Sequence, residues 1–335
     1  MSDSVRAIAL IGNRYSRMSE AFFEALLPLI EQRGLTLVLI DSSTAAQARW
    51  TRVLRNRLVA ALKALAMIRT ATHSRDWFRR KDARRFLQLT PTAHRIASPS
   101  LADEVEQRGV GAILVAGCDQ ILRRPLIDRV RRIINFHNGS LPAYRGCDVV
   151  LWSLLNRDRV AGYSFHTIES EEIDRGVIVA SGEIPLTSDD NVGSIDEKLI
   201  RAAVADLPCV VDNLCASVWP PAGMTLGHGS YYTASQSAAI RTFDVSMSKE
   251  RLLTVFRAAR SLRIPGPFAL RVTGLVEADE AGGHAWTLSL LRGRVVVRCR
   301  DGYVAITTVN YLPAVFFLPV LIWCIRGVSD RPRHA

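Results

Sequence analysis

The sequence predicts an α/β chain in which a mostly parallel sheet, with helices on both faces, is followed by a small β-rich domain. Near the start, short apolar runs alternate with segments of helical apolar spacing. A strand, a helix and a second strand in succession imply parallel strands joined by a right-handed crossover. A turn-rich segment around 215–233, followed by several short strands, then marks a second domain.

The individual elements follow from the same patterns. The spacing predicts a strand over 7–11, a helix over 16–33, and further strands over 35–40, 111–117, 132–137, 162–168 and 176–180. Beyond these we expect helices from about 194 to 207 and from 249 to 263, and short strands over 285–291, 294–298 and 303–309. The resulting division is a first domain over 1–210 with a basic helical insertion at about 44–90, a linker over 211–234, a β-rich domain over 235–310, and an apolar then basic tail over 311–335.

Composition narrows the class of protein. The chain has 335 residues, of which 48% are hydrophobic and 22% charged, enough apolar material for a large core and too much for disorder. Its six cysteines form no C-x-x-C pair and cluster with no histidines, which argues against a zinc site and for a reduced, intracellular setting. The apolar run at 7–11 is too short for a signal-peptide core, so we expect a cytoplasmic protein.

The net charge of +11 is concentrated in one segment. Between Thr44 and Thr90 there are twelve Lys or Arg residues against two acids. Such a segment is either a solvated helical insertion or a surface for an anionic partner, and a membrane surface fits that second interpretation. Peripheral membrane association is therefore compatible with the sequence, while a nucleic-acid partner is the weaker expectation.

A second apolar stretch, Tyr311 to Ile325, lies close to the end of the sequence. It contains Pro313 and Pro319 and is shorter than the roughly 20 residues of a membrane-spanning helix. We therefore expect a tail docked on the protein, in preference to an interfacial anchor.

Two polar side chains mark a candidate site at the end of a predicted central strand. Asn135 and His137 are two residues apart, so on a strand they point to the same face. The turn residues Asn138, Gly139 and Pro142 end this strand. The pair thus lies at the carboxyl end of a parallel strand, where open α/β sheets place their ligands.

A carboxylate from a separate loop completes the candidate site. Asp174 lies between two predicted strands, from where it can reach a histidine. A carboxylate beside His137 would orient the imidazole and raise its pKa, as general acid–base chemistry requires. The amide of Asn135 could donate to an oxygen on which negative charge develops.

The residues around this site resemble the signature of the folate-dependent formyltransferases. In that family Asn-x-His is followed by Ser-Leu and Pro-x-x-Arg-Gly, and here Asn135-Phe136-His137 is followed by Ser140-Leu141-Pro142 and Arg145-Gly146. A later family block, a Gly-started strand that ends in a hydrophobic-Asp-x-Gly loop, is similar to Gly162 through Ile173-Asp174-Arg175-Gly176. The resemblance covers 111–203 well, and 249–310 looks like the family's carboxyl-terminal domain.

The resemblance implies a Rossmann-like first domain, an OB-like second domain, and a transferase of one-carbon metabolism that uses 10-formyltetrahydrofolate as formyl donor. It implies catalytic roles for Asn135, His137 and Asp174, and no metal. The remaining implied site residues are Gln120, Ile121, Leu122, Ser140 and Ile173 for the folate, and Arg145 and Gly146 for the acceptor.

The acceptor is less defined than the donor. A small-molecule amine, such as a nucleotide-linked amino sugar or a hydroxyornithine-type amino acid, fits better than methionyl-tRNA. In the tRNA enzymes of the family the early basic loop is shorter and the terminal barrel complete. Two other functions stay open, a folate-binding protein without turnover and a protein that binds anionic surfaces. The sequence leaves the oligomeric state open.

Overall fold

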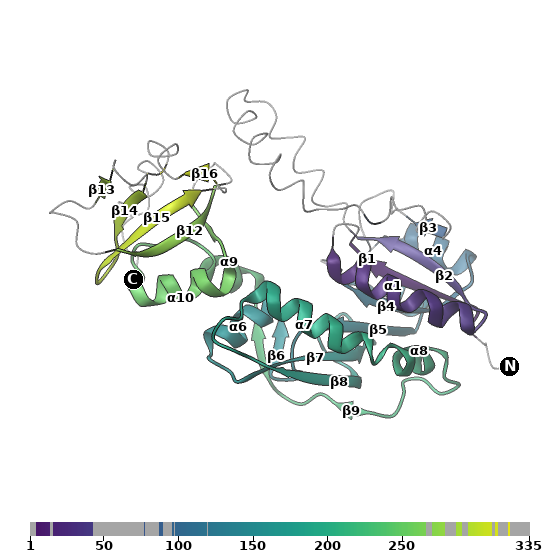
Figure 1. Ribbon diagram of the computed structural model, residues 1–335. Helices are drawn as coiled ribbons and strands as arrows, with labels where there is room; N and C mark the ends of the chain where they lie inside the picture. Colours follow the sequence, from purple (N-terminus) through teal and green to yellow (C-terminus); the bar gives the residue numbers. More distant parts are fainter. Residues whose placement is uncertain are drawn as a thin grey trace, which may run out of the picture.

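The computed structural model describes residues 5–13, 16–42, 77, 87–89, 96, 98–118, 120–265, 270–278, 286–289, 294–309, 312–313 and 321. The predicted basic helical insertion at about 44–90 lies almost entirely outside these ranges, as does most of the tail over 311–335. Two sheets lie at opposite ends of an elongated molecule (Figure 1). The larger sheet belongs to the first domain and the smaller to the second.

The larger sheet has eight strands in the order β3-β2-β1-β4-β5-β7-β8-β9. Their bounds are β1 Ala7–Gly12, β2 Thr36–Asp41, β3 Leu87–Leu89, β4 Val110–Ala116, β5 Arg132–His137, β7 Val160–Thr167, β8 Val177–Pro185 and β9 Met224–Thr225. The pairings from β3 to β5 are parallel, and those from β5 to β9 are antiparallel. The predicted α/β fold with a mostly parallel, Rossmann-like arrangement is confirmed.

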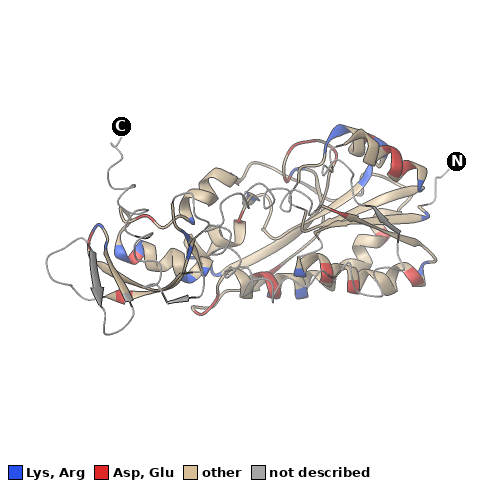
Figure 2. Ribbon diagram, turned by 90° about the horizontal axis from the view of Figure 1, so that it is seen from above, with Lys and Arg blue, Asp and Glu red and all other residues tan. Residues whose placement is uncertain are grey.

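Helices cover both faces of this sheet, as predicted. Their bounds are α1 Arg17–Gln32, α4 Pro99–Gln107, α5 Arg124–Arg129, α6 Val149–Leu155, α7 Val192–Val204 and α8 Leu207–Cys215. Helices α1, α7 and α8 pack on one face, and α4 and α5 pack on the other. Among the described residues, the charged ones lie mainly on the helices and loops, whereas the central strands carry few of them (Figure 2).

Strand alternation explains why this sheet can be covered on both sides. Ile8 and Leu10 of β1 face the core under α1, whereas Ala9 and Ile11 face the core under α4 and α5. Apolar residues at consecutive positions are the expected pattern for a strand buried on both faces. The continuous apolar runs that predicted these strands therefore arise because both faces of the sheet are buried at its centre.

The second domain is a small antiparallel sheet with two helices. Its path runs β11-β12-β15-β14-β13, and β16 pairs with β15. The bounds are α9 Ala234–Ile240, α10 Lys249–Ala259, β11 Leu262–Arg263, β12 Arg271–Ala278, β13 Trp286–Ser289, β14 Arg294–Arg298, β15 Tyr303–Val309 and β16 Leu312–Pro313. Leu321 is buried in the core of this domain.

The connection between the domains is more structured than the linker predicted over 211–234. Helix α8 continues to Cys215, beyond the predicted start of the linker. Within the rest of the connector, β9 pairs with β8 at the edge of the large sheet, and β10 (Ser230–Tyr232) pairs in parallel with β6 (Tyr144–Gly146). The turn-rich composition concealed these strands because each is only two or three residues long.

Among the described residues, no helix has the length and apolar character needed to cross a membrane. The apolar run over 311–325 is described only at 312–313 and 321.

Candidate functional site

Asn135 and His137 lie at the carboxyl end of β5, between the parallel strand β4 and the antiparallel strand β7. The chain then turns sharply at Gly139, where a Cβ atom would lie 2.7 Å from His137 Nε2. Ser164 of β7 holds this turn, because its hydroxyl donates to the Gly139 carbonyl at 3.0 Å and accepts from the Leu141 N–H at 3.1 Å. The predicted position of the pair is confirmed, and a glycine is required beside the imidazole.

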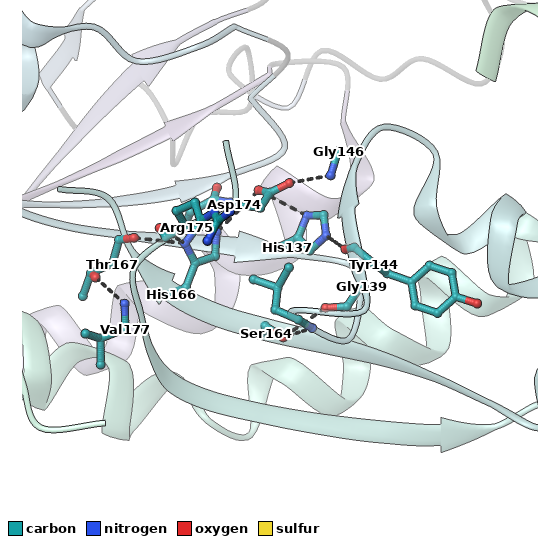
Figure 3. Close-up of polar contacts among 12 residues, drawn as sticks. His137, Gly139, Tyr144, Gly146, Ser164, His166, Thr167, Asp174, Arg175 and Val177 are labelled. Carbon is teal, nitrogen blue, oxygen red and sulfur yellow. Dashed lines mark hydrogen bonds and ion pairs between the residues drawn. The ribbon is translucent and has the colours of Figure 1, made fainter. Parts of the chain in front are cut away.

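Asp174 reaches the pair from the loop between β7 and β8 (Figure 3). Its Oδ1 lies 3.6 Å from His137 Nδ1 and 3.6 Å from His166 Nε2. Its Oδ2 accepts a hydrogen bond of 2.7 Å from the Gly146 N–H. The backbone of Asp174 has φ +50°, a left-handed conformation that Asp tolerates better than most residues. The structure thus brings the amide, imidazole and carboxylate together.

The surroundings of His137 fix the orientation of its ring. Its Nε2–H donates to the carbonyl of Tyr144 at 2.6 Å, which leaves Nδ1 directed at Asp174. The side chain is only 7% exposed. Burial lowers the pKa of His137, and this effect outweighs the attraction of Asp174, which acts to raise it. Asp174 thus acts on the pKa of His137 in the expected direction, but the loss of hydration dominates and the net shift is downward.

Asp174 is held in the ionised state. Burial acts to raise its pKa, but the neighbouring rings of His166 and His137 and the Gly146 N–H together lower it below its ordinary value. A neutral imidazole and a carboxylate therefore face each other at neutral pH. In this state His137 Nδ1 is free to accept a proton.

His166 of β7 is buried and supports the site through Asn135. Its Nδ1–H donates to the carbonyls of Thr167 at 3.0 Å and Arg175 at 3.3 Å. Its Nε2 then accepts from the Asn135 amide at 3.1 Å. These contacts fix the Asn135 side chain so that its NH₂ group faces the ring of His166. Only the pairing of His166 with Asn135 across β5 and β7 reveals this role, and the sequence pattern does not.

A cavity of about 530 Å³ opens over these residues. Its lining includes the three predicted catalytic residues, Asn135, His137 and Asp174. It also includes five residues predicted to bind the folate or the acceptor: Gln120, Ile121, Leu122, Ile173 and Gly146. The other lining residues are Met18, Val115, Gly117, Cys118, Phe136, Asn138, Cys147, His166, Ile168, Ser170, Glu171, Glu172, Tyr231 and Ala234.

Two predicted binding residues do not line the cavity. Ser140 packs instead against Gly162 of β7, where a Cβ atom would lie only 2.1 Å from the Ser140 hydroxyl oxygen. Arg145 turns toward the connector, where it donates to the Gly229 carbonyl at 3.0 Å. The pairing of β6 with β10 diverts Arg145, and the tight packing of the turn on β7 diverts Ser140.

The apolar end of the cavity is held rigid from two sides. The Gln120 amide donates to the Ser42 carbonyl at 2.8 Å and accepts from the Ile96 N–H at 3.0 Å. Glu171, on the loop between β7 and β8, accepts from the Arg124 N–H at 3.0 Å and pairs with Arg123 at 2.8 Å, which ties this loop to the segment after Leu122. Between these anchors, Ile121 and Ile173 are exposed at 45% and 36%. The arrangement is suited to a flat, apolar ring inserted between two walls.

The chemistry available in the cavity is that of neutral donors and carboxylates. No Lys or Arg of the described chain lines it. In the same part of the chain, no group of three His, Cys, Asp or Glu residues could hold a metal ion. Burial raises the pKa of the Cys147 thiol, which leaves it protonated and unreactive. Among the groups that line the cavity, those of Asn135, His137 and Asp174 are the candidates for the chemistry.

Comparison with known proteins agrees with this geometry. Residues 47–211 match the family described as formyl transferase. The methionyl-tRNA formyltransferase of Streptococcus pyogenes serotype M28 (strain MGAS6180) is 34% identical over 113 residues, which cover 34% of this chain and 35% of that protein. The matched segment therefore spans about a third of the length of that relative.

Two solved structures share the fold over most of the chain. HypX from Aquifex aeolicus, in complex with tetrahydrofolic acid, has a TM-score of 0.55 and 14% identity, covering 91% of this chain and 44% of that one. The N-formyltransferase from Helicobacter canadensis, in complex with folinic acid and dTDP-3-aminofucose, also has a TM-score of 0.55, with 11% identity and coverage of 90% and 98%. At these identities the likeness establishes the fold.

Proposed function

We propose that this chain, whose residues 47–211 belong to the formyl transferase family, transfers a formyl group from 10-formyltetrahydrofolate to an amine of a small acceptor molecule. One observation carries the proposal. The side chains of Asn135, His137 and Asp174, from a strand end and a separate loop, converge on a single cavity. Their convergence supports acyl transfer, which needs a donor for a developing negative charge and a base for the amine.

The cavity is compatible with the folate. Its apolar end offers Ile121, Leu122 and Ile173 as walls for a pterin ring, and Gly117, with φ +79°, lets the backbone approach closely. A cavity of about 530 Å³ lies within the range of pockets that enclose small ligands. The donor supplies the formyl carbon that the amine attacks.

Each of the three central residues then has a defined task. Asn135, oriented by His166, donates an amide N–H to the formyl oxygen as negative charge develops there. His137, neutral before the reaction, accepts the proton that the amine loses when its nitrogen bonds to the formyl carbon. Asp174 stabilises the imidazolium that results, and the same proton is delivered to the folate nitrogen when its bond to the formyl carbon breaks.

A small-molecule acceptor is supported by the shape of the site and by one structural neighbour. The Helicobacter canadensis enzyme, which shares the fold over 90% of this chain, was solved with dTDP-3-aminofucose. A nucleotide-linked amino sugar and a hydroxyornithine-type amino acid are therefore the two acceptors to test first.

Methionyl-tRNA is the second candidate acceptor, because the relatives matched by sequence are methionyl-tRNA formyltransferases. Those matches cover about a third of each protein, which is why the acceptor of the relative is not carried over directly.

The test is incubation of the protein with 10-formyltetrahydrofolate and a panel of amines, read by mass spectrometry for a mass gain of one formyl group. The panel contains dTDP-3-aminofucose, hydroxyornithine and methionyl-tRNA. We expect formylation of one of the two small molecules. The matched controls are protein without donor and the Asp174→Asn variant. Formylation of the tRNA alone would favour the second candidate, and binding of folate without any product would refute catalysis.

A further inference from the structure

We infer that Tyr231, supplied by the connector between the domains, is the platform on which the acceptor lies, and that the acceptor carries its amine on a ring. This inference rests on the proposed formyl transfer and specifies its second substrate. It follows from the position of Tyr231 in the cavity, from the rigidity of its support, and from the face that its ring leaves open.

Tyr231 lies on the side of the cavity away from its apolar end, which we call the apolar slot. The residues that line the cavity beside it are Gly146, Cys147 and Ala234, whereas the other end is lined by Gln120–Leu122, Ile168 and 170–173. The central residues lie between these two regions, since Asp174 accepts from the Gly146 N–H. If the slot holds the pterin, the amine must approach from the region of Tyr231.

Strand β10 is locked in place, so Tyr231 is presented in a fixed position. The backbone of β10 pairs with β6, and the Cys147 N–H donates to the Tyr232 carbonyl at 2.8 Å. The next side chain, Tyr232, points the other way and stacks between Trp152 and Tyr144, at ring distances of 4.8 and 5.7 Å. Adjacent tyrosines on a strand thus serve as an anchor and an exposed surface.

Arg145 lies over one face of the Tyr231 ring, while the residue as a whole stays largely exposed. The guanidinium carbon of Arg145 lies over the ring at 6.0 Å from its centre. Arg145 is itself held by the Gly229 carbonyl, so it fixes the plane of the ring and does not reach the cavity. Tyr231 is nevertheless 44% exposed, a large aromatic surface for a side chain on a paired strand.

An exposed, immobilised aromatic ring in a cavity is suited to stacking against a flat or cyclic partner. A ring of the acceptor can lie on the free face of Tyr231, whereas an extended amino acid chain would cover little of it. An aromatic contact of this kind contributes roughly 0.5–1.5 kcal/mol, which is up to about tenfold in affinity. Tyr231 is therefore expected to select cyclic over acyclic amines.

The test compares variants of Tyr231 in the full-length protein. For dTDP-3-aminofucose, Tyr231→Ala should raise the acceptor KM by about two- to tenfold, while the KM for 10-formyltetrahydrofolate stays unchanged. Tyr231→Phe, which keeps the ring, should behave like the wild type. The control is Met224→Ala, because Met224 is 65% exposed on the same connector and does not line the cavity.

A second measurement does not depend on turnover. In Tyr231→Trp, the new indole should change its emission when dTDP-3-aminofucose is added, after subtraction of the wild-type signal, and should not respond to hydroxyornithine. A response to the amino sugar without product in the wild type would support the platform and refute formyl transfer. Product with no KM change in Tyr231→Ala, or formylation of hydroxyornithine alone, would overturn the platform and leave formyl transfer standing.

Discussion

Strands β5 and β10 supply side chains to the same cavity, but they reach it in different ways. Strand β5 lies at the centre of the large sheet, and its apolar residues and polar end are adjacent in sequence. Strand β10 has three residues and belongs to the connector, and it is positioned only by its pairing with β6. The comparison teaches that Asn135 and His137 are fixed by the large sheet itself, whereas Tyr231, in the region that we propose for the acceptor, depends on how the connector is attached.

The largest effect should come from Asp174, the carboxylate that a loop places beside His137 of β5. Asp174→Asn keeps the shape of the side chain but removes the charge that stabilises a protonated His137. We expect kcat/KM for formyl transfer to fall at least about a hundredfold, as for loss of a general acid–base group. The control is Asp189→Asn, since Asp189 is exposed and outside the cavity. Wild-type turnover in Asp174→Asn would show that formyl transfer does not need the Asp174 carboxylate.

The next effect tests the attachment of β10. Gly146 has φ +97°, and an added Cβ would lie 2.1 Å from the Tyr232 carbonyl oxygen. Gly146→Ala should therefore separate β6 from β10, weaken acceptor binding, and destabilise the fold by about 1–3 kcal/mol. Thermal melting and the acceptor KM measure this. Gly227→Ala is the control, because its Cβ meets nothing within 4 Å, and equal melting temperatures for the two variants would contradict the strain argument.

The pH dependence sharpens the β5 side further. Burial lowers the pKa of His137 below its ordinary value of 6.5, so the neutral form is favoured in the folded state. The profile of kcat/KM should be level through neutral pH and fall only below 6.5. The unfolding free energy should fall in the same direction, because protonation of His137 is easier in the unfolded chain. An imidazole titration by NMR that places the pKa of His137 above 6.5 would contradict this.

The smallest effect concerns the support of the aromatic stack. The Asn156 amide donates to the hydroxyls of Tyr144 at 3.0 Å and Tyr232 at 3.2 Å. Because Asn156 is exposed, Asn156→Ala should cost only about 0.5–1 kcal/mol in urea unfolding. Asn213→Ala, in which the lost contacts lie within one helix, is the matched control. A larger loss in the control would mean that the stack does not need this bridge.

Much of the first domain could be predicted because its strands are continuous apolar runs. Strand β5 was predicted with its observed bounds, and β1, β2 and β4 within one residue at each end. The short helices α4, α5 and α6 were missed, since six to nine residues give too little periodicity to detect. The strands β6, β9 and β10 were missed because tertiary pairing creates them, and no local pattern does.

The same distinction applies to the site. Asn135, His137 and Asp174 could be found because motif residues lie next to apolar strands and turns. The contribution of His166 could not, because a histidine that alternates with apolar residues looks like part of the core. Tyr231 was assigned to a linker, where composition gives no sign that one tyrosine is stacked and its neighbour exposed. The sign of the pKa shift of His137 also depends on burial, which a sequence does not report.

Helix α6 contributes to two hydrophobic cores at once. Val150 belongs to the core of the large sheet, while Leu151 and Leu155, on other sides of the same helix, belong to the core of the second domain. If either domain unfolded alone, apolar residues of α6 would become exposed to water. Heat should therefore unfold both domains in a single cooperative transition. A chain cut short after the connector would leave Leu151 and Leu155 bare, and it would be prone to aggregate before its chemistry could be assayed.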